Sequence, residues 1–306
     1  MVATPFASYS ALRRLRCSPE SVSAQAVLRH RARVSADARL DVTMALAGLG
    51  VVLAVATLVW LLSVKLRDAS IADIYWGSGF VMLAWLYCLL SGTMTTRSWL
   101  VAALITLWGA RLSLHIFLRN RGHVEDPRYQ AMRARRGPAF WWQSLFTVFW
   151  LQGAILWFVS LPLLAAVRAE HPSYLTAIDG LGIALFVVGL AFEVIGDYQL
   201  TRFKADPMNR GQVLDRGLWR YTRHPNYFGD ATMWWGVYAL ACATPGGWLT
   251  LLSPALMSFL LMRVSGVTLL EQGLKESRPG YRDYITRTSS FFPWFPRAPR
   301  HYGRQG

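Results

Sequence analysis

The 306-residue chain has few acidic residues and little cysteine. It contains 17 Asp and Glu against 32 Lys and Arg, and charged residues make up only 16% of the total. Its 3 cysteines, Cys17, Cys88 and Cys242, show no Cys-x-x-Cys or Cys/His spacing, so we expect no disulfide and no metal site. A small charged fraction beside 54% hydrophobic residues argues against a soluble domain and favours a membrane protein.

Apolar runs of almost bilayer-spanning length recur along the chain. A transmembrane helix needs roughly 20 predominantly apolar residues, and the run from Met44 to Val64 carries no charge. Thr244-Pro-Gly-Gly247 is a short turn, which predicts a hairpin of the last two runs. The sequence thus predicts an all-α, multi-pass transmembrane helical bundle of about seven spans. The predicted spans are 44–64, 71–91, 99–118, 143–164, 177–196, 229–245 and 247–270.

The basic residues lie mainly on one side of this predicted bundle. Apart from residues 1–40, most lie in three loops and the C-terminal tail, at 65–70, 119–138, 197–228 and 271–306. The loops on the other side carry one each, Arg97 and Arg168. The positive-inside rule makes the basic face cytosolic, or its organellar equivalent. Anionic lipid explains this charge, so it does not call for nucleic acid.

Residues 1–40 conflict with this topology, because seven spans place the amino terminus opposite the basic face. The segment is rich in Arg and Ser, has only Glu20 and Asp37 as acids, and lacks an apolar core. We predict a mitochondrial or plastid transit peptide or, alternatively, a basic N-terminal arm with a miscounted span. Residues 41–306 are then the transmembrane domain. A transit peptide predicts an organellar membrane.

The segment Gly217–Asp230 gathers polar residues at the mouth of a predicted span, where they are costly unless they bind something. Its polar side chains include Arg220, Arg223, His224, Asn226, Tyr227 and Asp230. Planar guanidinium groups suit phosphates, and an amide that donates and accepts suits a carboxamide or nucleobase. The positive-inside rule and an aromatic belt would also explain Arg220 and Tyr221, but not Asn226 and Asp230.

Two carboxylates precede this segment. Glu193 and Asp197 are four residues apart and share one helical face, where they repel each other unless cations or donors lie between them. We predict that Arg202, Lys204 or Arg223 supplies the cation, or that the ribose hydroxyls of a ligand donate to the acids. The alternative is a solvated helix end with interfacial ion pairs.

Polar residues also occur within the second and third predicted spans. An arginine inside a span faces a partner or a wet cavity, and Asp73 is the natural partner for Arg111. Arg111 and His115 are four apart and share a face. Either the Asp73–Arg111 pair is structural, or Asp73, Tyr75, Arg111 and His115 form a proton relay or a clamp on a substrate carbonyl. The loop 119–129 is a lid or a charged connection.

The C-terminal tail adds aromatic residues. Tyr281 and Tyr284 share a face if that piece is helical, and they either close over a base or headgroup or pack on the bundle. Glu271 and Lys275, at i and i+4, predict an exposed ion pair.

Arg223-His-Pro-Asn-Tyr-Phe-Gly-Asp230, the Leu-Trp-Arg-Tyr before it and the Tyr-x-x-Tyr with Phe-Phe-Pro in the tail resemble the steroid 5-alpha-reductase-like superfamily. The nearest branch is one of uncharacterised multi-pass proteins, and the resemblance runs from about Asp73 to Pro296. It implies a membrane enzyme that binds NADPH between its C-terminal spans and reduces a carbon–carbon double bond in a lipid or steroid-like enone. The cofactor-facing residues would be Glu193, Asp197, Lys204, Arg223, Asn226, Asp230 and Tyr284.

The substrate half departs from that pattern. Trp108 or Gly109 stands where steroid reductases have a tyrosine proton donor, which argues against a 3-oxo-steroid substrate. Donors aimed at the enone oxygen would lower the barrier, and Tyr75, Arg111 and His115 are the candidates. Tryptophans such as Trp108 suit an apolar substrate pocket, or simply aromatic packing.

Two alternatives remain open at this point. Isoprenylcysteine and phospholipid methyltransferases share an Arg-His-Pro-x-Tyr-x-Gly signature like residues 223–229 and bind S-adenosylmethionine. A lipid-binding membrane protein with an inactive cofactor pocket is the non-enzymatic alternative. We expect an NADPH-dependent oxidoreductase whose partners are the bilayer and an apolar lipid substrate, without nucleic acid or metal.

Overall fold

The computed structural model describes residues 19–122, 124–264, 271, 273–275 and 278–297, with side chains from residue 40 onward. The chain divides into two units, Met1–Thr43 and Met44–Gly306, and the contacts below lie within the second. The predicted transit peptide or basic arm, residues 1–40, lies largely outside the described residues and stays a prediction.

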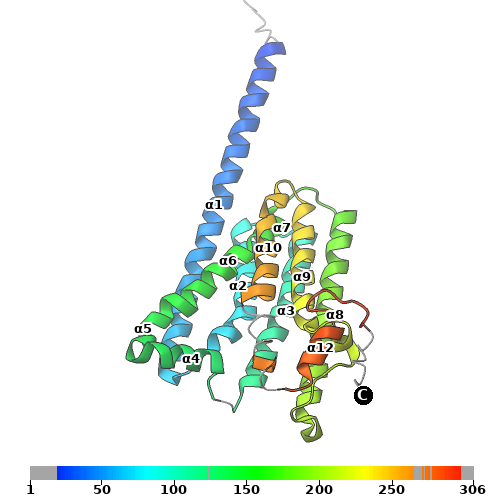
Figure 1. Ribbon diagram of the computed structural model, residues 1–306. Helices are drawn as coiled ribbons and strands as arrows, with labels where there is room; N and C mark the ends of the chain where they lie inside the picture. The colour runs from blue at the N-terminus through cyan, green and yellow to red at the C-terminus, as the bar shows by residue number, and fades with distance from the viewer. Residues whose placement is uncertain (1–18, 123, 265–270, 272, 276–277, 298–306) are drawn as a thin grey trace, which may run out of the picture. The chain divides into compact units, whose positions relative to one another are not determined.

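The described residues form helices and no strand, which confirms the all-α prediction (Figure 1). The α-helices are α1 (Pro19–Leu66), α2 (Ile71–Ser91), α3 (Thr96–Asn120), α4 (Pro127–Arg136), α5 (Phe140–Ser144), α6 (Leu151–Val159), α7 (Leu161–Arg168), α8 (Ala177–Ala205), α9 (Pro225–Cys242), α10 (Leu252–Phe259) and α12 (Tyr281–Arg287). The 3-10 helices are η1 (Gly137–Ala139), η3 (Pro207–Asn209), η4 (Gly217–Arg220) and η5 (Gly247–Leu251). Two π-helical turns, η2 (Leu145–Trp150) and η6 (Leu260–Val264), follow α5 and α10.

Six helical segments are long and apolar enough to cross a membrane, consistent with a multi-pass protein of about seven spans. These are Leu40–Leu66, Ile71–Ser91, Thr96–Asn120, Pro127–Arg168, Ala177–Ala205 and Gly247–Val264. The remaining predicted span, 229–245, corresponds to α9, which starts earlier, at Pro225. The predicted span 247–270 extends at least to Val264, and residues 265–270 lie outside the description.

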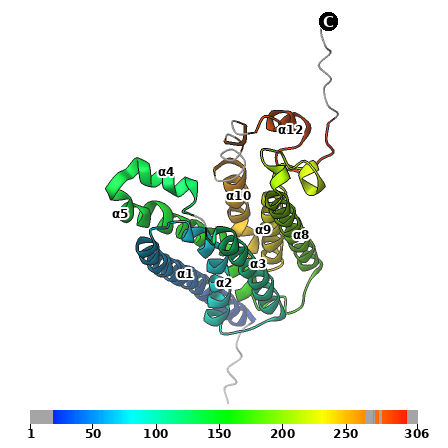
Figure 2. The ribbon, with the colours of Figure 1, turned by 90° about the horizontal axis from the view of Figure 1, so that it is seen from below.

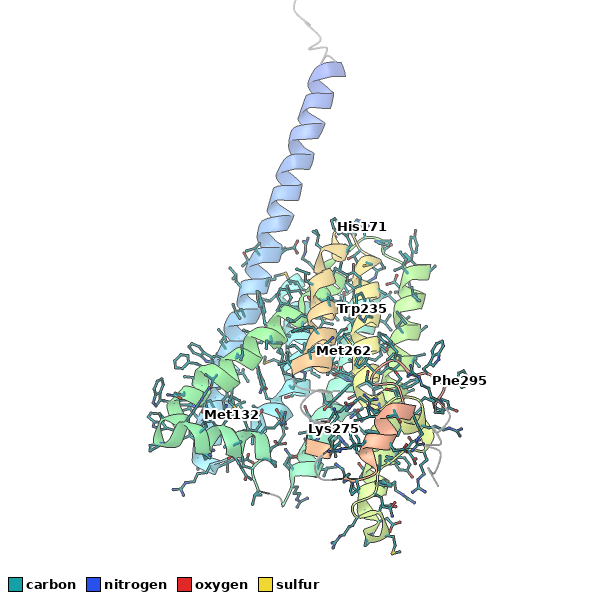
Figure 3. The ribbon with its side chains drawn as sticks, in the orientation of Figure 1. Met132, His171, Trp235, Met262, Lys275 and Phe295 are labelled. Carbon is teal, nitrogen blue, oxygen red and sulfur yellow. The ribbon has the colours of Figure 1, made fainter. Side chains whose placement is uncertain are left out.

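The basic segments meet at one end of the second unit. Figure 3 places Met132, on α4, and Lys275 toward one end, and His171, in the connection before α8, at the other. Near that other end, Arg97 forms a buried ion pair with Asp179 at 2.7 Å. Asp179 also accepts a 2.7 Å hydrogen bond from the backbone of Thr176, in the capping box that starts α8. The pair ties the start of α3 to the start of α8, and these contacts compensate its buried charges.

Glycines let α8 and α9 approach within backbone contact. A Cβ added at Gly189 would lie 2.4 Å from the carbonyl oxygen of Gly229, and one at Gly182 would lie 2.8 Å from that of Gly236. Both pairs lie on the same faces because each helix spaces its glycines by seven residues, about two turns. Small residues allow such contact between membrane helices. The pairing places the end of α8 beside the start of α9.

A similar contact joins α2 and α3. A Cβ at Gly77 would lie 2.4 Å from the carbonyl oxygen of Gly109. The Ser113 hydroxyl donates to the Ile74 carbonyl at 2.7 Å and accepts from the Ser78 backbone N–H at 2.9 Å. These bonds hold α3 in one register against α2.

Aromatic rings fill the space between α2, α3 and α9. Phe80, Trp108 and Trp234 are each 0% exposed. The ring centroids of Phe80 and Trp234 lie 4.5 Å apart, and those of Trp108 and Trp234 lie 5.7 Å apart. At these positions the rings pack together in the interior.

We expect Gly189→Ala to destabilise the protein by about 1–3 kcal/mol, the usual cost of overpacking. The new methyl group would meet backbone atoms of Gly229 and Met233, which cannot turn aside as a side chain can. Gly180→Ala is the matched control on α8, because nothing lies within 4 Å of a Cβ there. Thermal unfolding in detergent should show a lower Tm for Gly189→Ala alone. Equal Tm values for the two variants would contradict this account of the α8–α9 contact.

Candidate functional site

A cavity of about 600 Å³ lies where the ends of α3 and α8 meet the start of α9 and the C-terminal tail. Its volume is typical of small-molecule sites. Among the predicted cofactor residues, Lys204, Arg223, His224, Asn226, Tyr227, Tyr281 and Tyr284 line it. Arg220 is exposed and is not among its lining residues. Glu193, Asp197 and Asp230 also do not line it; Asp197 contacts the lining residue Asn226, and Glu193 shares Arg111 with Asp197.

Five Lys and Arg residues and one acid, Asp126, line this cavity, and three of the five cations come from separate segments without an ion pair among the described residues. Arg119 lies in the last turn of α3, Lys204 lies in the last turn of α8, and Arg278 precedes α12. Lys204 is within electrostatic range of both arginines. None of the three forms an ion pair with a carboxylate in the described part of the chain; Arg119 donates to the Asn120 side chain and Arg278 to the Gln212 carbonyl. Like charges held together in this way attract an anion.

Arg111 of α3 lies between the two acids of α8. Its Nη1 donates to Glu193 Oε1 at 2.6 Å, and its Nη2 contacts Asp197 Oδ2. The other Glu193 oxygen accepts from Trp108 Nε1 at 2.8 Å. Glu193 is only 4% exposed, so these charge-assisted bonds replace the water that it loses.

Two predicted pairings are therefore wrong. The cation between the acids is Arg111, and not Arg202, Lys204 or Arg223; the partner of Arg111 is the acid pair, and not Asp73. The physical reason is interhelical register. Arg202 and Lys204 lie in the last turn of α8, beyond the two acids. Arg111 lies on α3, at the level where this helix packs beside Glu193 and Asp197.

His115 belongs to the same group. Its Nε2 lies 3.7 Å from Asp197 Oδ2, one turn along α3 from Arg111. The structure thus brings Arg111 and His115 together, as predicted from their spacing.

Asp73 and Tyr75 belong to other contacts. Asp73 accepts from the Tyr129 hydroxyl at 2.7 Å and pairs with Arg128 at 2.6 Å. The Tyr75 hydroxyl lies 3.4 Å from the Val52 carbonyl oxygen. The predicted four-residue relay is therefore not assembled as one group. Asp73 connects to the cavity through Arg128, which lines it.

Asn226 links the acids to the cavity wall. Its amide Nδ2 donates to Asp197 Oδ1 at 3.1 Å, and its Oδ1 accepts from the Tyr227 backbone N–H. One turn further, the buried Asp230 carboxylate lies within reach of the Trp234 N–H, but neither Asp230 Oδ1 nor Trp234 Nε1 has a well-formed hydrogen bond in the described structure. A water molecule or a polar ligand group between this acceptor and this donor would complete both bonds.

The arrangement does not resemble a metal centre. Within the described ranges, no group of three or more His, Cys, Asp or Glu could hold a metal ion.

Arg223 joins the α8–α9 connection to the tail. Its Nε pairs with Glu271 Oε1 at 2.7 Å, and its Nη1 donates to the carbonyls of Ile285 at 3.1 Å and Thr288 at 2.5 Å. His224 Nε2 lies 3.2 Å from the same Glu271 oxygen. We call this group of contacts the Arg223 latch.

The latch overturns the prediction for Glu271. Glu271 is buried and pairs with Arg223. The sequence predicts an exposed ion pair with Lys275 instead. The Nε and Nη1 groups of Arg223 donate to Glu271 and to carbonyls of the tail. A role of Arg223 in phosphate binding therefore stays a prediction. The partner of Glu271 lies 48 residues away in sequence, beyond the reach of helical spacing.

The tail forms one wall of the cavity. It follows the 217–224 connection through hydrogen bonds from Arg223 N to the Ser289 carbonyl and from the Thr222 hydroxyl to the Phe291 carbonyl. Tyr281 and Tyr284 have ring centroids 5.7 Å apart, as their spacing predicts. Burial raises the pKa of Tyr281 to about 12, so its hydroxyl remains a neutral donor at cellular pH.

Sequence reasoning did not single out Arg119 or Arg278 as site residues. Arg119 follows Arg111 and His115 at intervals of four residues on α3, so their common helical face was a usable signal. Arg278 precedes α12 outside any periodic pattern, and only the fold of the tail brings it to the cavity.

We expect acid to weaken the Arg223 latch. Burial raises the pKa of Glu271, but hydrogen bonds and charge from His224 and Arg223 outweigh it and hold the pKa below its ordinary value. Such a carboxylate stabilises the fold above its unfolded pKa, about 4.3, and this contribution is lost as pH falls through the folded value. The wild type should therefore have a higher Tm than Glu271→Gln at pH 7, with the difference shrinking near and below pH about 4. A difference that stays constant with pH would contradict this role.

Comparisons with known proteins identify a family and leave the activity open. An uncharacterised protein of Schizosaccharomyces pombe is 26% identical over 261 residues, covering 76% of this chain and 75% of that protein. A probable O-methyltransferase, ustE, of Ustilaginoidea virens is 40% identical over 60 residues, covering 20% of this chain and 21% of its own length. No solved structure matches significantly. Residues 59–288 match the model of one family, described as "Protein of unknown function (DUF1295)", and the chain belongs to that family.

Proposed function

We propose that this protein is a membrane-embedded, NADPH-dependent reductase of a carbon–carbon double bond in an apolar lipid or steroid-like enone. The observation that carries the proposal is the convergence of Arg119, Lys204 and Arg278 on one cavity, with no carboxylate paired to any of them in the described structure. A phosphate-bearing nucleotide would neutralise this cluster. The superfamily resemblance of the Arg223–Asp230 motif points to the same cofactor.

The other cavity walls suit the remainder of such a nucleotide. Asn226 offers an amide that donates and accepts, and Tyr281 and Tyr284 present aromatic surface. Beyond the cavity wall, one helical turn after Asn226, the neighbouring Asp230 oxygen and Trp234 N–H offer one acceptor and one donor. A polar group reaching this depth would satisfy both.

The chemistry requires a hydride and a proton. Bound NADPH would supply the hydride to the β carbon of the enone, becoming NADP⁺, while a proton adds to the α carbon. The chain would hold the negative charge that develops on the enone oxygen. Arg111 and His115 are the donors proposed for that task, because both contact the same acid, and Glu193 and Asp197 orient Arg111. Fixed donors of this kind lower the barrier without reorganising during reaction.

A methyltransferase is the second candidate, and two observations favour it. One is the partial similarity to a probable O-methyltransferase. The other is the charge of the interior, where Glu193, Asp197 and Asp230 adjoin the single guanidinium of Arg111. The cationic sulfonium of S-adenosylmethionine would suit that group of acids. It carries no phosphate, however, so it leaves the cation cluster of the cavity unexplained.

We expect Lys204→Ala and Arg278→Ala each to weaken NADPH binding by about tenfold or more, the usual loss for a charge-assisted hydrogen bond. Arg282→Ala is the matched control, because Arg282 is exposed on α12 and does not line the cavity. Equilibrium titration of the purified protein with NADPH and with S-adenosylmethionine measures this. Added salt should weaken NADPH binding. Tight S-adenosylmethionine binding without NADPH binding would reverse the ranking of the two candidates.

The reaction itself is tested by product mass. Purified protein incubated with NADPH and a lipid extract should yield a species two hydrogens heavier than its precursor, and Lys204→Ala should lower that yield while Arg282→Ala keeps it. A methyl-sized gain with S-adenosylmethionine would establish the transferase instead. Lipid affinity with neither product would favour a non-catalytic lipid-binding protein.

A further inference from the structure

Another cavity lies between the end of α1 and the α4–α5 segment. Its volume is about 240 Å³, and its lining includes Ser63, Arg67, Arg133, Phe140, Trp141 and Ser144. It shares no lining residue with the 600 Å³ cavity. Figures 1 and 2 place α4 and α5 on the side of the bundle away from α8 and α12. This volume is below the usual range for drug-sized ligands, so a small polar group suits it better than a nucleotide.

Arg67 occupies an unusual backbone position beside this cavity. It directly follows α1, with φ of 55°, in the left-handed region that glycine or asparagine normally supplies at a helix end. Among the described residues it is the one non-glycine with positive φ. Its exposed side chain has no hydrogen-bond or ion-pair partner in the described part of the protein. An arginine kept where glycine would be less strained indicates a use for its side chain.

Arg133 faces the same cavity and is held in place. Its Nε and Nη2 bind Glu125 at 3.0 and 2.8 Å, and its guanidinium lies over the Phe140 ring, 4.6 Å from the centroid. Its Nη1 has no partner in the described structure. Glu125 also accepts from the Ala69 backbone N–H. Glu125 neutralises Arg133, and the Asp68 carboxylate lies within electrostatic range of Arg133. Neither acid forms an ion pair with the Arg67 guanidinium among the described residues, so that charge remains available to a ligand.

The surroundings have the character of a membrane interface. The rings of Trp60 and Trp141 stack with centroids 6.2 Å apart, and Trp141 is 54% exposed. Leu62 and Leu66, on the last turns of α1, are 49% and 55% exposed. Tryptophan beside arginine at the end of an apolar helix is typical of the headgroup level. Basic pockets at that level bind anionic headgroups.

We propose that this cavity binds the headgroup phosphate of an anionic phospholipid between Arg67 and Arg133, with the acyl chains along the exposed leucines of α1. Two planar guanidinium groups offer forked donors to one phosphate. Arg133 is preorganised by Glu125 and Phe140, whereas the free side chain of Arg67 closes on the ligand. The exposed apolar surface beside the cavity selects lipid over free phosphate. The site is separate from the proposed reductase function, and its test does not depend on activity.

The test is native mass spectrometry of the full chain released from bilayers of phosphatidylcholine with a minor fraction of phosphatidylglycerol. The wild type should retain one phosphatidylglycerol in preference to phosphatidylcholine. Arg67→Gln should lower that occupancy by about tenfold relative to Arg135→Gln, as expected for one charge-assisted contact. Arg135 is an exposed arginine of α4 outside the cavity lining, so the two variants change the net charge equally.

Arg67→Gly separates lipid binding from folding. Glycine relieves the left-handed backbone, so its Tm without added lipid should be unchanged or higher while the bound phosphatidylglycerol is lost. Equal loss in Arg67→Gln and Arg135→Gln would overturn the proposal, because it would show only general attraction to the surface. Inorganic phosphate that displaces the lipid at low concentration would also overturn it, by identifying free phosphate as the ligand.

Discussion

The backbone contact between α8 and α9 brings the acids of α8 beside the polar residues that open α9. Because Gly189 and Gly229 have no side chains, the two helices lie close enough for Glu193 and Asp197 on one to adjoin Asn226 and Asp230 on the other. Any larger side chain at these glycines would separate the helices. In a lipid environment, where helix association depends on close packing, the same contact therefore sets both the fold of the C-terminal half and the geometry of its site.

The charged groups of this site are separated by sign. Acids lie toward the interior around Arg111, while Arg119, Lys204 and Arg278 lie at the basic end of the bundle. Glu193 and Asp197 are compensated by hydrogen bonds within the protein, whereas the outer cations have no carboxylate partners in the described residues. A ligand that is anionic at one end and polar at the other matches this arrangement. The proposed nucleotide has that character.

The Arg223 latch holds the C-terminal tail in place as a wall of the cavity, and it lies outside the membrane-spanning helices. One guanidinium binds a carboxylate and two carbonyls of the tail, and so holds Tyr281 and Tyr284 in the wall. The motif that carries the superfamily resemblance thus has a structural task beside the binding role proposed for it. Arg223 shapes the pocket through the tail, while Asn226, three residues later, faces the acids. The two roles are adjacent in sequence because His224-Pro225 turns the chain into α9 between them.

The amino-acid sequence by itself determined the spans, the common face of Glu193 and Asp197, and the polar entrance to α9. These are local properties: the bilayer requires long apolar helices, helical periodicity sets which residues share a face, and Pro225 favours a helix start. Only the tertiary structure decided that Arg111 pairs with the acids of α8 and that Glu271 pairs with Arg223. Those partners lie on different elements, so their meeting depends on how glycine contacts and tail packing set the register between helices. Periodicity within one helix carries no information about that register.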